Sequence, residues 1–246
     1  MTANLKRLAI VGVTTLLIGL LALFPARIAY SWFAPTELRL SEIGGTIWSG
    51  VATEGDAAGI YIRNLSWRFK PLALFTGKLA FSTRLDPAGG FMSGDIFAGF
   101  NGSVLFKNLD AAVPISALRN LVQIPGLDGR IRLQFEALEL HNGRPVAADG
   151  TVDISNLFIR GLAATAIGDY HAQFSTTNDG ILASINDTGG FFDLAGTLKI
   201  SPDSVYLLTG LVAPTRETPP AVIEQLRFLG SANDRGQREF RFEGRL

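Results

Sequence analysis

The chain has 246 residues and carries 22 basic and 22 acidic side chains, so its formal net charge is zero at pH 7. It contains no cysteine, which excludes disulfides, thiolate nucleophiles, thiolate-ligated metals and a lipid anchor attached through cysteine. Residues 31–246 hold 19 basic and 22 acidic residues without a polybasic stripe, so we expect no nucleic acid partner.

The N-terminal segment is a run of 19 uncharged, mostly apolar residues from Leu8 to Ala26, between Lys6 and Arg7 on one side and Arg27 on the other. As a helix it would reach roughly 28 Å, close to the hydrocarbon thickness of a bilayer. A cleaved signal peptide is the alternative, but its apolar core is shorter, about 7–15 residues. The one nearby cleavage pattern, Ala29-Tyr30-Ser31, also precedes a bulky tryptophan. We therefore predict a retained transmembrane helix over residues 8–26.

The flanks of this segment predict its orientation. The tail, residues 1–7, is short and carries two basic side chains and the free amine, and positive charge prefers the cytoplasmic side. Tyr30, Trp32 and Phe33 follow the apolar run, as is typical of an interfacial aromatic belt. We therefore expect a cytoplasmic tail and, in a bacterium, a periplasmic domain over residues 27–246.

Alternation of apolar and polar residues in this domain predicts β-strands. Residues 130–136 place three apolar side chains on one face, and at the C-terminus Phe240 and Phe242 alternate with Arg241 and Glu243. Turn signals separate such runs at Asn101-Gly102, Asp128-Gly129, Asn142-Gly143, Asp149-Gly150 and residues 178–180. We predict a mainly β fold, an extended antiparallel sheet or sandwich, in which Phe240 and Phe242 share one core face.

Two short helices are expected as packing elements. Residues 113–124 have Pro114 near the start and Pro125-Gly126 as a stop signal. Residues 220–229 begin with a proline, and Gly230 follows the last apolar residue.

A faint internal repeat places an Asn-Leu pair at the end of three strand-like runs. The pairs are Asn64-Leu65, Asn108-Leu109 and Asn156-Leu157, which lie 44 and 48 residues apart. Related β units stacked side by side would give an extended sheet with a continuous apolar face. The alternative is that such runs are common in any antiparallel protein.

The sequence predicts no catalytic residue, no cofactor and no metal site, and hence no enzyme. His141 and His171 lack the partner spacing of a metal site, and no serine stands in a nucleophile elbow. The double glycines Gly44-Gly45, Gly89-Gly90 and Gly189-Gly190 do not open a helix after a strand, so we interpret them as turns or bulges.

The aromatic residues allow two interpretations. Trp48 and Trp67 are expected to fill the core of the domain. The sharper alternative is an apolar surface or groove for a protein partner or a lipid, lined by residues such as Phe97, Phe106 and Phe192.

Four passages together resemble protein N of the type II secretion system. They are the end of the apolar segment, Phe24-Pro25-Ala26-Arg27; residues 40–50, LSEIGGTIWSG; residues 65–79, LSWRFKPLALFTGKL; and the C-terminal residues 226–230, LRFLG, with 242–246, FEGRL. The order and spacing of these four passages carry the resemblance.

The resemblance implies a single-pass inner-membrane protein with a β-rich periplasmic domain. Such a protein is an accessory part of the machinery that exports folded proteins across the outer membrane, and its partners are other secretion proteins. The same plan also looks like the AsmA-like group of anchored periplasmic β proteins, which are linked to lipid traffic. The resemblance defines no catalytic residues.

Overall fold

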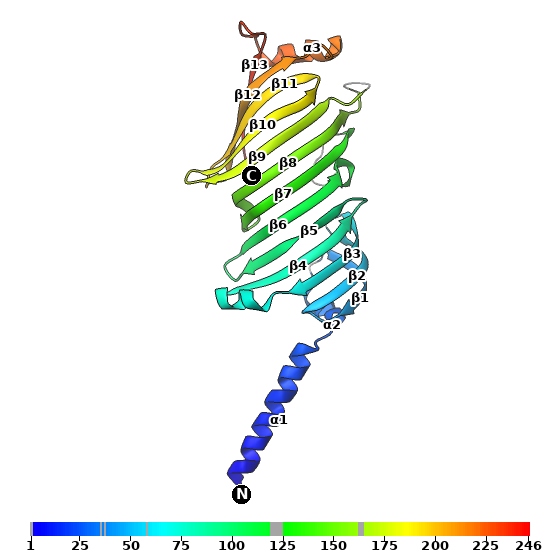
Figure 1. Cartoon of the computed structure of the whole chain (residues 1–246), viewed down its shortest axis with the longest axis vertical. Coiled ribbons are helices and arrows are strands. Elements are labelled where there is room, and N and C mark those ends of the chain that lie inside the picture. Colours follow the sequence, from blue (N-terminus) through cyan, green and yellow to red (C-terminus); the bar gives the residue numbers. More distant parts are fainter. Residues whose placement is uncertain (1, 35, 37, 58, 119–124, 162–164) are drawn as a thin grey trace.

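The computed structural model describes residues 2–34, 36, 38–57, 59–118, 125–161 and 165–246. An N-terminal helix leads into a body built on one twisted antiparallel sheet of 13 strands (Figure 1). Each strand pairs with the next one along the chain, so the strand order in the sheet follows the sequence from β1 to β13. The mainly β fold and the extended antiparallel sheet are confirmed, and the described strands form one sheet, not the two of a sandwich.

The strands are short at both ends of the sheet and longest in its middle. In order they are β1 Leu38–Gly45, β2 Ser49–Ala57, β3 Ile60–Phe69, β4 Lys78–Pro87, β5 Phe91–Gly99, β6 Ser103–Pro114, β7 Leu127–His141, β8 Arg144–Ile159, β9 Gly168–Thr177, β10 Gly180–Gly190, β11 Phe192–Ile200, β12 Val205–Pro214 and β13 Arg238–Arg245.

The N-terminal segment forms two helices, where the sequence predicts a single helix from residue 8 to residue 26. Helix α1 is Thr2–Ala22 and helix α2 is Ala26–Phe33. The predicted bounds are wrong because Pro25 is extended (φ −66°, ψ 132°) and forms a β-bridge with Thr46, which ends the first helix. Among the described residues, no helix has both the length and the apolarity that a membrane span requires.

The junction between helix and sheet is held by main-chain and tryptophan hydrogen bonds. The Trp48 indole Nε1 donates to the Leu21 carbonyl over 2.7 Å, and the Ile47 N–H donates to the Phe24 carbonyl over 3.1 Å. The Trp48 ring also lies 4.8 Å, centroid to centroid, from the Phe69 ring. The half-buried Trp48 thus connects the first hairpin of the sheet to the end of α1.

Of the two predicted short helices, one is confirmed and one is wrong where the structure describes it. Residues 220–229 form helix α3, Pro220–Leu226, and the 3₁₀ turn η3, Arg227–Leu229. Residues 113–114 instead continue strand β6, because Val113 pairs with Ile131 of β7, and only the 3₁₀ turn η2, Ile115–Leu118, follows. Tertiary strand pairing overrides the local helix signal here. Residues 119–124 lie outside the described part of the chain.

The three asparagines of the Asn-Leu repeat share one backbone role. Asn64, Asn108 and Asn156 have φ angles of 53°, 50° and 53°, in the left-handed region that asparagine tolerates better than most residues. Each lies where the pairing register of its strand shifts. The shift lets apolar residues three positions apart face the same side: Ile62 and Leu65, Phe106 and Leu109, Ile154 and Leu157.

Candidate functional site

One face of the sheet is continuously apolar. Directly paired residues of neighbouring strands share a face. Two rows of such partners cross most of the sheet: Phe69, Phe81, Ile96, Phe106, Leu138 and Ala148 from β3 to β8, and Leu109, Phe135, Gly150, Phe174, Ala183, Leu198, Leu208 and Phe242 from β6 to β13. Phe240 pairs with Gly210 on the same face, so the prediction that Phe240 and Phe242 share a face is confirmed. The predicted core position holds for Phe240 but is wrong for Phe242, which lies on the edge strand and is 53% exposed.

A pocket of about 380 Å³ lies on this face toward the C-terminal edge of the sheet. Strands β8 to β13 form its floor, and α3 with η3 borders it, burying Val222 and Leu226 of α3. Its lining is apolar almost throughout: Leu157, Ile159, Ile167, Tyr170, Ile185, Phe192, Leu194, Gly196, Leu208, Val212, Leu226, Leu229, Phe240 and Phe242. We call this hollow the apolar pocket.

Two glycines make room for the aromatic ring at the centre of the apolar pocket. A Cβ atom added to Gly210 would lie 2.5 Å from Cζ of Phe240, and one added to Gly196 would lie 3.4 Å from the same atom. The Phe240 ring therefore lies directly on the backbone of strands β11 and β12, where other residue types would place side chains. This packing keeps Phe240 buried on an edge strand.

Tyr170 lines the apolar pocket and carries a partly buried phenol. Burial, together with the nearby Asp187 and Asp169 carboxylates, raises the pKa of the Tyr170 phenol to about 12. The phenol is therefore neutral at physiological pH and can donate a hydrogen bond. An apolar ligand would suit this lining better than a charged one.

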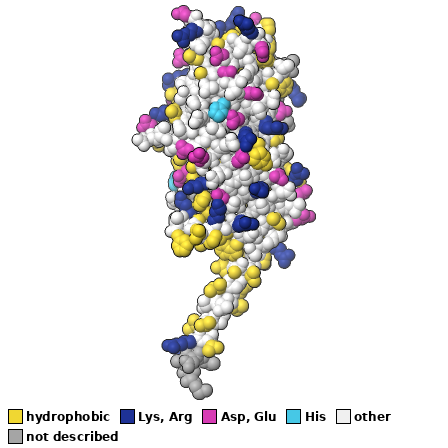
Figure 2. All heavy atoms as spheres, in the orientation of Figure 1, with side chains coloured by type: hydrophobic (Ala, Val, Ile, Leu, Met, Phe, Trp, Pro, Cys, Tyr) yellow, Lys and Arg dark blue, Asp and Glu magenta, His cyan; other side chains and the backbone are white. Residues whose placement is uncertain are grey.

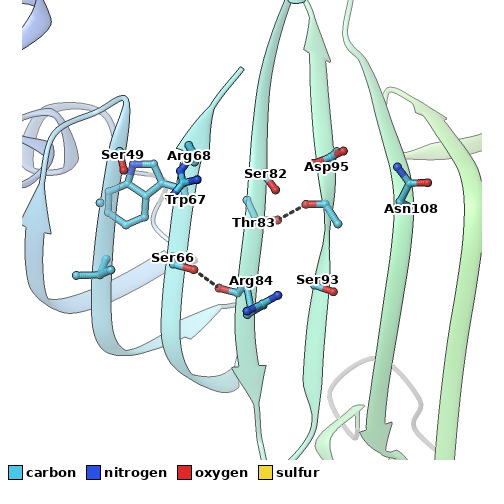
Figure 3. A pocket seen from close by; sticks show the side chains of 13 residues that line it. Ser49, Ser66, Trp67, Arg68, Ser82, Thr83, Arg84, Ser93, Asp95 and Asn108 are labelled. Atoms are coloured by element: carbon cyan, nitrogen blue, oxygen red, sulfur yellow. Dashed lines mark hydrogen bonds between the residues drawn. The ribbon is translucent and has the colours of Figure 1, made fainter. Parts of the chain in front are cut away.

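A second hollow, of about 460 Å³, lies over strands β2 to β6 and is polar (Figure 3). Figure 3 shows Ser82 and Thr83 of β4 between Arg68 of β3 and Asp95 of β5. The Ser66 hydroxyl donates to the Arg84 carbonyl over 3.4 Å. The Asp95 carboxylate lies 2.5 Å from the Lys70 ammonium. The Thr83 hydroxyl likewise donates to the Gly94 carbonyl over 3.2 Å, so both of these hydroxyl groups are bonded to the main chain of a neighbouring strand.

The structure separates the histidines that the sequence singles out. His141 is exposed at the end of β7, beside the Asn142-Gly143 turn, as predicted. His171 lies on the polar face, where its Nδ1 is 2.6 Å from an oxygen of Asp153. Within the described ranges, no three His, Asp or Glu side chains gather as metal ligands would.

The double glycines occupy turns and bulges, as the sequence predicts. Gly45 ends β1 and Gly89 follows β4, both with positive φ angles. Gly189 and Gly190 follow a register shift in β10.

One predicted groove residue is misplaced. Phe97 pairs with Leu105, one position out of step with the row that contains Ile96 and Phe106, so it lies on the polar face. Because side chains alternate along a strand, neighbouring apolar residues cannot both line one groove. The ammonium of Lys107 instead lies 5.7 Å from the centroid of the Phe97 ring. Phe106 and Phe192 do lie on the apolar face.

Comparison with known proteins gives a consistent family. The family model for the type II secretion system (T2SS), protein N, matches residues 36–241. Type II secretion system protein N of Aeromonas hydrophila is 23% identical over 221 residues, 86% of each chain. The proteins of the same description from Pectobacterium carotovorum subsp. carotovorum and Vibrio cholerae serotype O1 are 23% and 24% identical, over 90% and 95% of each chain.

No solved structure is significantly similar to this chain. The family match extends from just before β1 to Arg241 in β13, so it covers strands β1 to β12, the polar hollow and every residue of the apolar pocket except Phe242. The chain belongs to the type II secretion system protein N family.

Proposed function

We propose that this protein is an accessory inner-membrane component of the type II secretion machinery and acts through protein–protein contacts in the export of folded proteins across the outer membrane. The observation that carries the proposal is the family match over residues 36–241. This family contributes a component of a secretion machine and not a known catalytic activity. The other secretion proteins are the expected partners.

The proposed membrane attachment is the segment from residue 8 to residue 26, with residues 1–7 in the cytoplasm and the sheet in the periplasm. Its large apolar side chains within α1 are exposed: Leu8, Ile10, Val11, Val13, Leu16, Leu17, Ile18, Leu20 and Leu21. Exposed apolar area of this extent favours a lipid environment. Lys6 and Arg7 support a cytoplasmic N-terminus.

The proposed protein contact is the open edge of the sheet at β13. Strand β1, at the other edge, is partly covered, because the Tyr30 hydroxyl of α2 donates to the Leu38 carbonyl over 2.9 Å and accepts from the Leu40 N–H over 2.8 Å. Strand β13 has only β12 as a described neighbour in the sheet. An uncovered edge can add a strand from another protein through main-chain hydrogen bonds.

The register of β13 gives this contact a defined form. Phe240, Phe242 and Gly244 direct their main-chain groups toward β12, as the Leu246 N–H does when it donates to the Ser204 carbonyl over 2.9 Å. The intervening residues, Glu239, Arg241, Glu243 and Arg245, therefore direct theirs to the open edge. Their side chains also alternate in charge, so a strand bound here would be selected by complementary charges.

The alternative function is lipid binding in the manner of AsmA-like proteins. The apolar pocket is the observation that favours it, since its volume of about 380 Å³ falls in the range of small-molecule sites and its lining is almost free of polar atoms. A periplasmic sheet that binds an acyl chain in this pocket would take part in lipid traffic between the membranes.

Photo-crosslinking in native membranes distinguishes these functions. A photoreactive amino acid at Glu243, on the open edge, is expected to crosslink to other type II secretion proteins, identified by mass spectrometry. The matched control is Ser184, on the polar face of the central strand β10, where no crosslink is expected. Crosslinks to lipid from Phe192 in the apolar pocket, with none from Glu243, would favour lipid binding.

A further inference from the structure

We propose that the 3₁₀ turn η1, Pro71–Thr76, is a second membrane contact that inserts into the interfacial region of an anionic bilayer beside α1. The inference rests on the proposed membrane attachment through the N-terminal segment, and it extends that attachment to the body of the protein.

The turn η1 presents large apolar side chains to solvent. Phe75 is 89% exposed and Leu72 is 76% exposed, and Leu74 is also exposed. Ala73, between them, is buried against the sheet, so the turn is fixed with its apolar side outward. Three large apolar side chains within four residues that cover no core of their own mark an interaction surface.

The main chain of η1 is suited to a membrane interface. The Gly77 N–H donates to the Leu74 carbonyl over 3.0 Å, the Ala73 N–H donates to the Lys70 carbonyl over 3.1 Å, and the Thr76 hydroxyl donates to the Ala73 carbonyl over 2.7 Å. Gly77 closes the turn in the left-handed conformation (φ 69°) that glycine adopts readily. Main-chain groups that already form hydrogen bonds within the turn have a small free-energy cost of transfer from water to the membrane interface.

The position of η1 indicates that its binding partner is the bilayer. In Figure 1, η1 lies at the lower end of the sheet, between β3 and β4, at the same end as α2 and α1. Figure 2 shows hydrophobic side chains gathered at this end of the body, above the apolar surface of α1. Trp32 and Phe33 of α2 are exposed at this end as well. Aromatic side chains of this kind are enriched at membrane interfaces.

The charges around η1 complement an anionic lipid surface. Residues 57–85 contain no acidic residue but carry five basic ones: Arg63, Arg68, Lys70, Lys78 and Arg84. Lys70 and Lys78 flank the turn directly, although Lys70 is also paired with Asp95. Arg63 and Arg84 lie toward the far ends of β3 and β4, so Lys70 and Lys78 are the basic residues at the turn itself. Basic residues beside an inserted apolar turn are attracted to anionic headgroups.

The absence of cysteine allows a direct test on the full chain. Single substitutions Phe75→Cys, Leu16→Cys and Phe228→Cys would each carry an environment-sensitive fluorophore, and each protein would be reconstituted into vesicles of phosphatidylethanolamine and phosphatidylglycerol. Phe228 is the matched control, because it is 91% exposed in η3 near the opposite edge of the sheet. Lipids with nitroxide-labelled acyl chains would then quench any fluorophore that enters the bilayer.

We expect strong quenching at positions 16 and 75 and little at position 228, and we expect Lys78→Glu to reduce the quenching at position 75. Quenching at position 16 without quenching at position 75 would overturn the inference and leave the membrane attachment intact. Quenching at neither position would reject both. A fluorophore at position 75 that is shielded only when other secretion proteins are added would mean that η1 is a protein interface, which also overturns the inference. Export measured in cells tests the secretion function separately.

Discussion

The aromatic ring of Phe240 on β13 occupies the space above Gly210 on β12, where a Cβ atom would lie 2.5 Å from the ring. The two residues are direct cross-strand partners. An edge strand thereby contributes a buried side chain to the apolar pocket, and the size of the residue on one strand determines whether the ring on the other can be buried.

Truncation of the two phenylalanines of β13 is expected to have unequal effects. Phe240 is 8% exposed and Phe242 is 53% exposed. Phe240→Ala should therefore lower the free energy of unfolding by about 3–5 kcal/mol, the usual cost for a core phenylalanine. Phe242→Ala should cost only about 1 kcal/mol, because about half of the ring is already in water. Chemical denaturation measures both, with Arg241→Ala as a near-neutral surface control. Equal losses from the two alanine variants would show that β13 is not packed in this way.

The backbone conformation of Asn108 predicts a different pair of effects. Its φ angle of 50° costs most residues about 1–2 kcal/mol, but it costs glycine almost nothing. Asn108→Val should therefore destabilise the sheet by about 1–2 kcal/mol or more, whereas Asn108→Gly should be nearly neutral. Thermal unfolding of the two variants checks this. If valine were tolerated as well as glycine, the register shift in β6 would not depend on a left-handed residue.

The raised pKa of Tyr170 predicts a loss of stability in alkaline solution. The folded state holds the phenol proton up to a pKa of about 12, whereas the unfolded chain releases it near the ordinary pKa of 10. Between these values the folded state binds more protons, so the free energy of unfolding falls as pH rises. Tyr170→Phe removes this contribution and should flatten the decline from pH 10 to pH 12. Denaturation of both proteins across this range measures it, and identical slopes would show that Tyr170 is not shielded from water.

The proposed orientation of the N-terminal segment predicts the activity of a reporter. Alkaline phosphatase fused after residue 40 should be active, because the basic tail should keep residues 1–7 in the cytoplasm and place the fusion point in the periplasm. A fusion in which Lys6 and Arg7 are replaced by glutamate is the control and should lose part of this activity. An inactive reporter, or a mature N-terminus near Trp32, would contradict a retained anchor.

The sequence predicts the strands well because alternation and Asn-Gly or Asp-Gly turns are local signals. Residues 130–136 and Phe240–Phe242 fall in strands with the expected alternation, and residues 220–229 are helical as expected. The errors arise where contacts between residues far apart in the sequence determine the local secondary structure. Val113 pairs with Ile131 and stays in a strand, and Pro25 bridges to Thr46 and ends α1. Neither partner is visible from the local sequence.

The candidate site is less predictable than the strands. Phe192 lies in the apolar pocket, but Phe97 lies on the opposite face, because side chains alternate along β5 and its neighbour Ile96 occupies the apolar face. Which of these two residues faces the core depends on the pairing with β6, which composition alone does not give. The register shift between the two strands does have a sequence signal, the Asn-Leu pair at Asn108. The pocket itself depends on Gly196 and Gly210, which leave room for the Phe240 ring. The sequence alone does not show that these strand glycines lie beside Phe240.

The most direct measurement of the central claim is the export of type II substrates from a strain that lacks this protein, complemented with the wild-type chain or with a chain that ends before β13. The deletion should reduce export and leave the lipid composition of the outer membrane unchanged. The wild-type chain should restore export, and the shortened chain should not. Normal export from the deletion strain, together with lipid bound to the purified protein, would contradict the central claim.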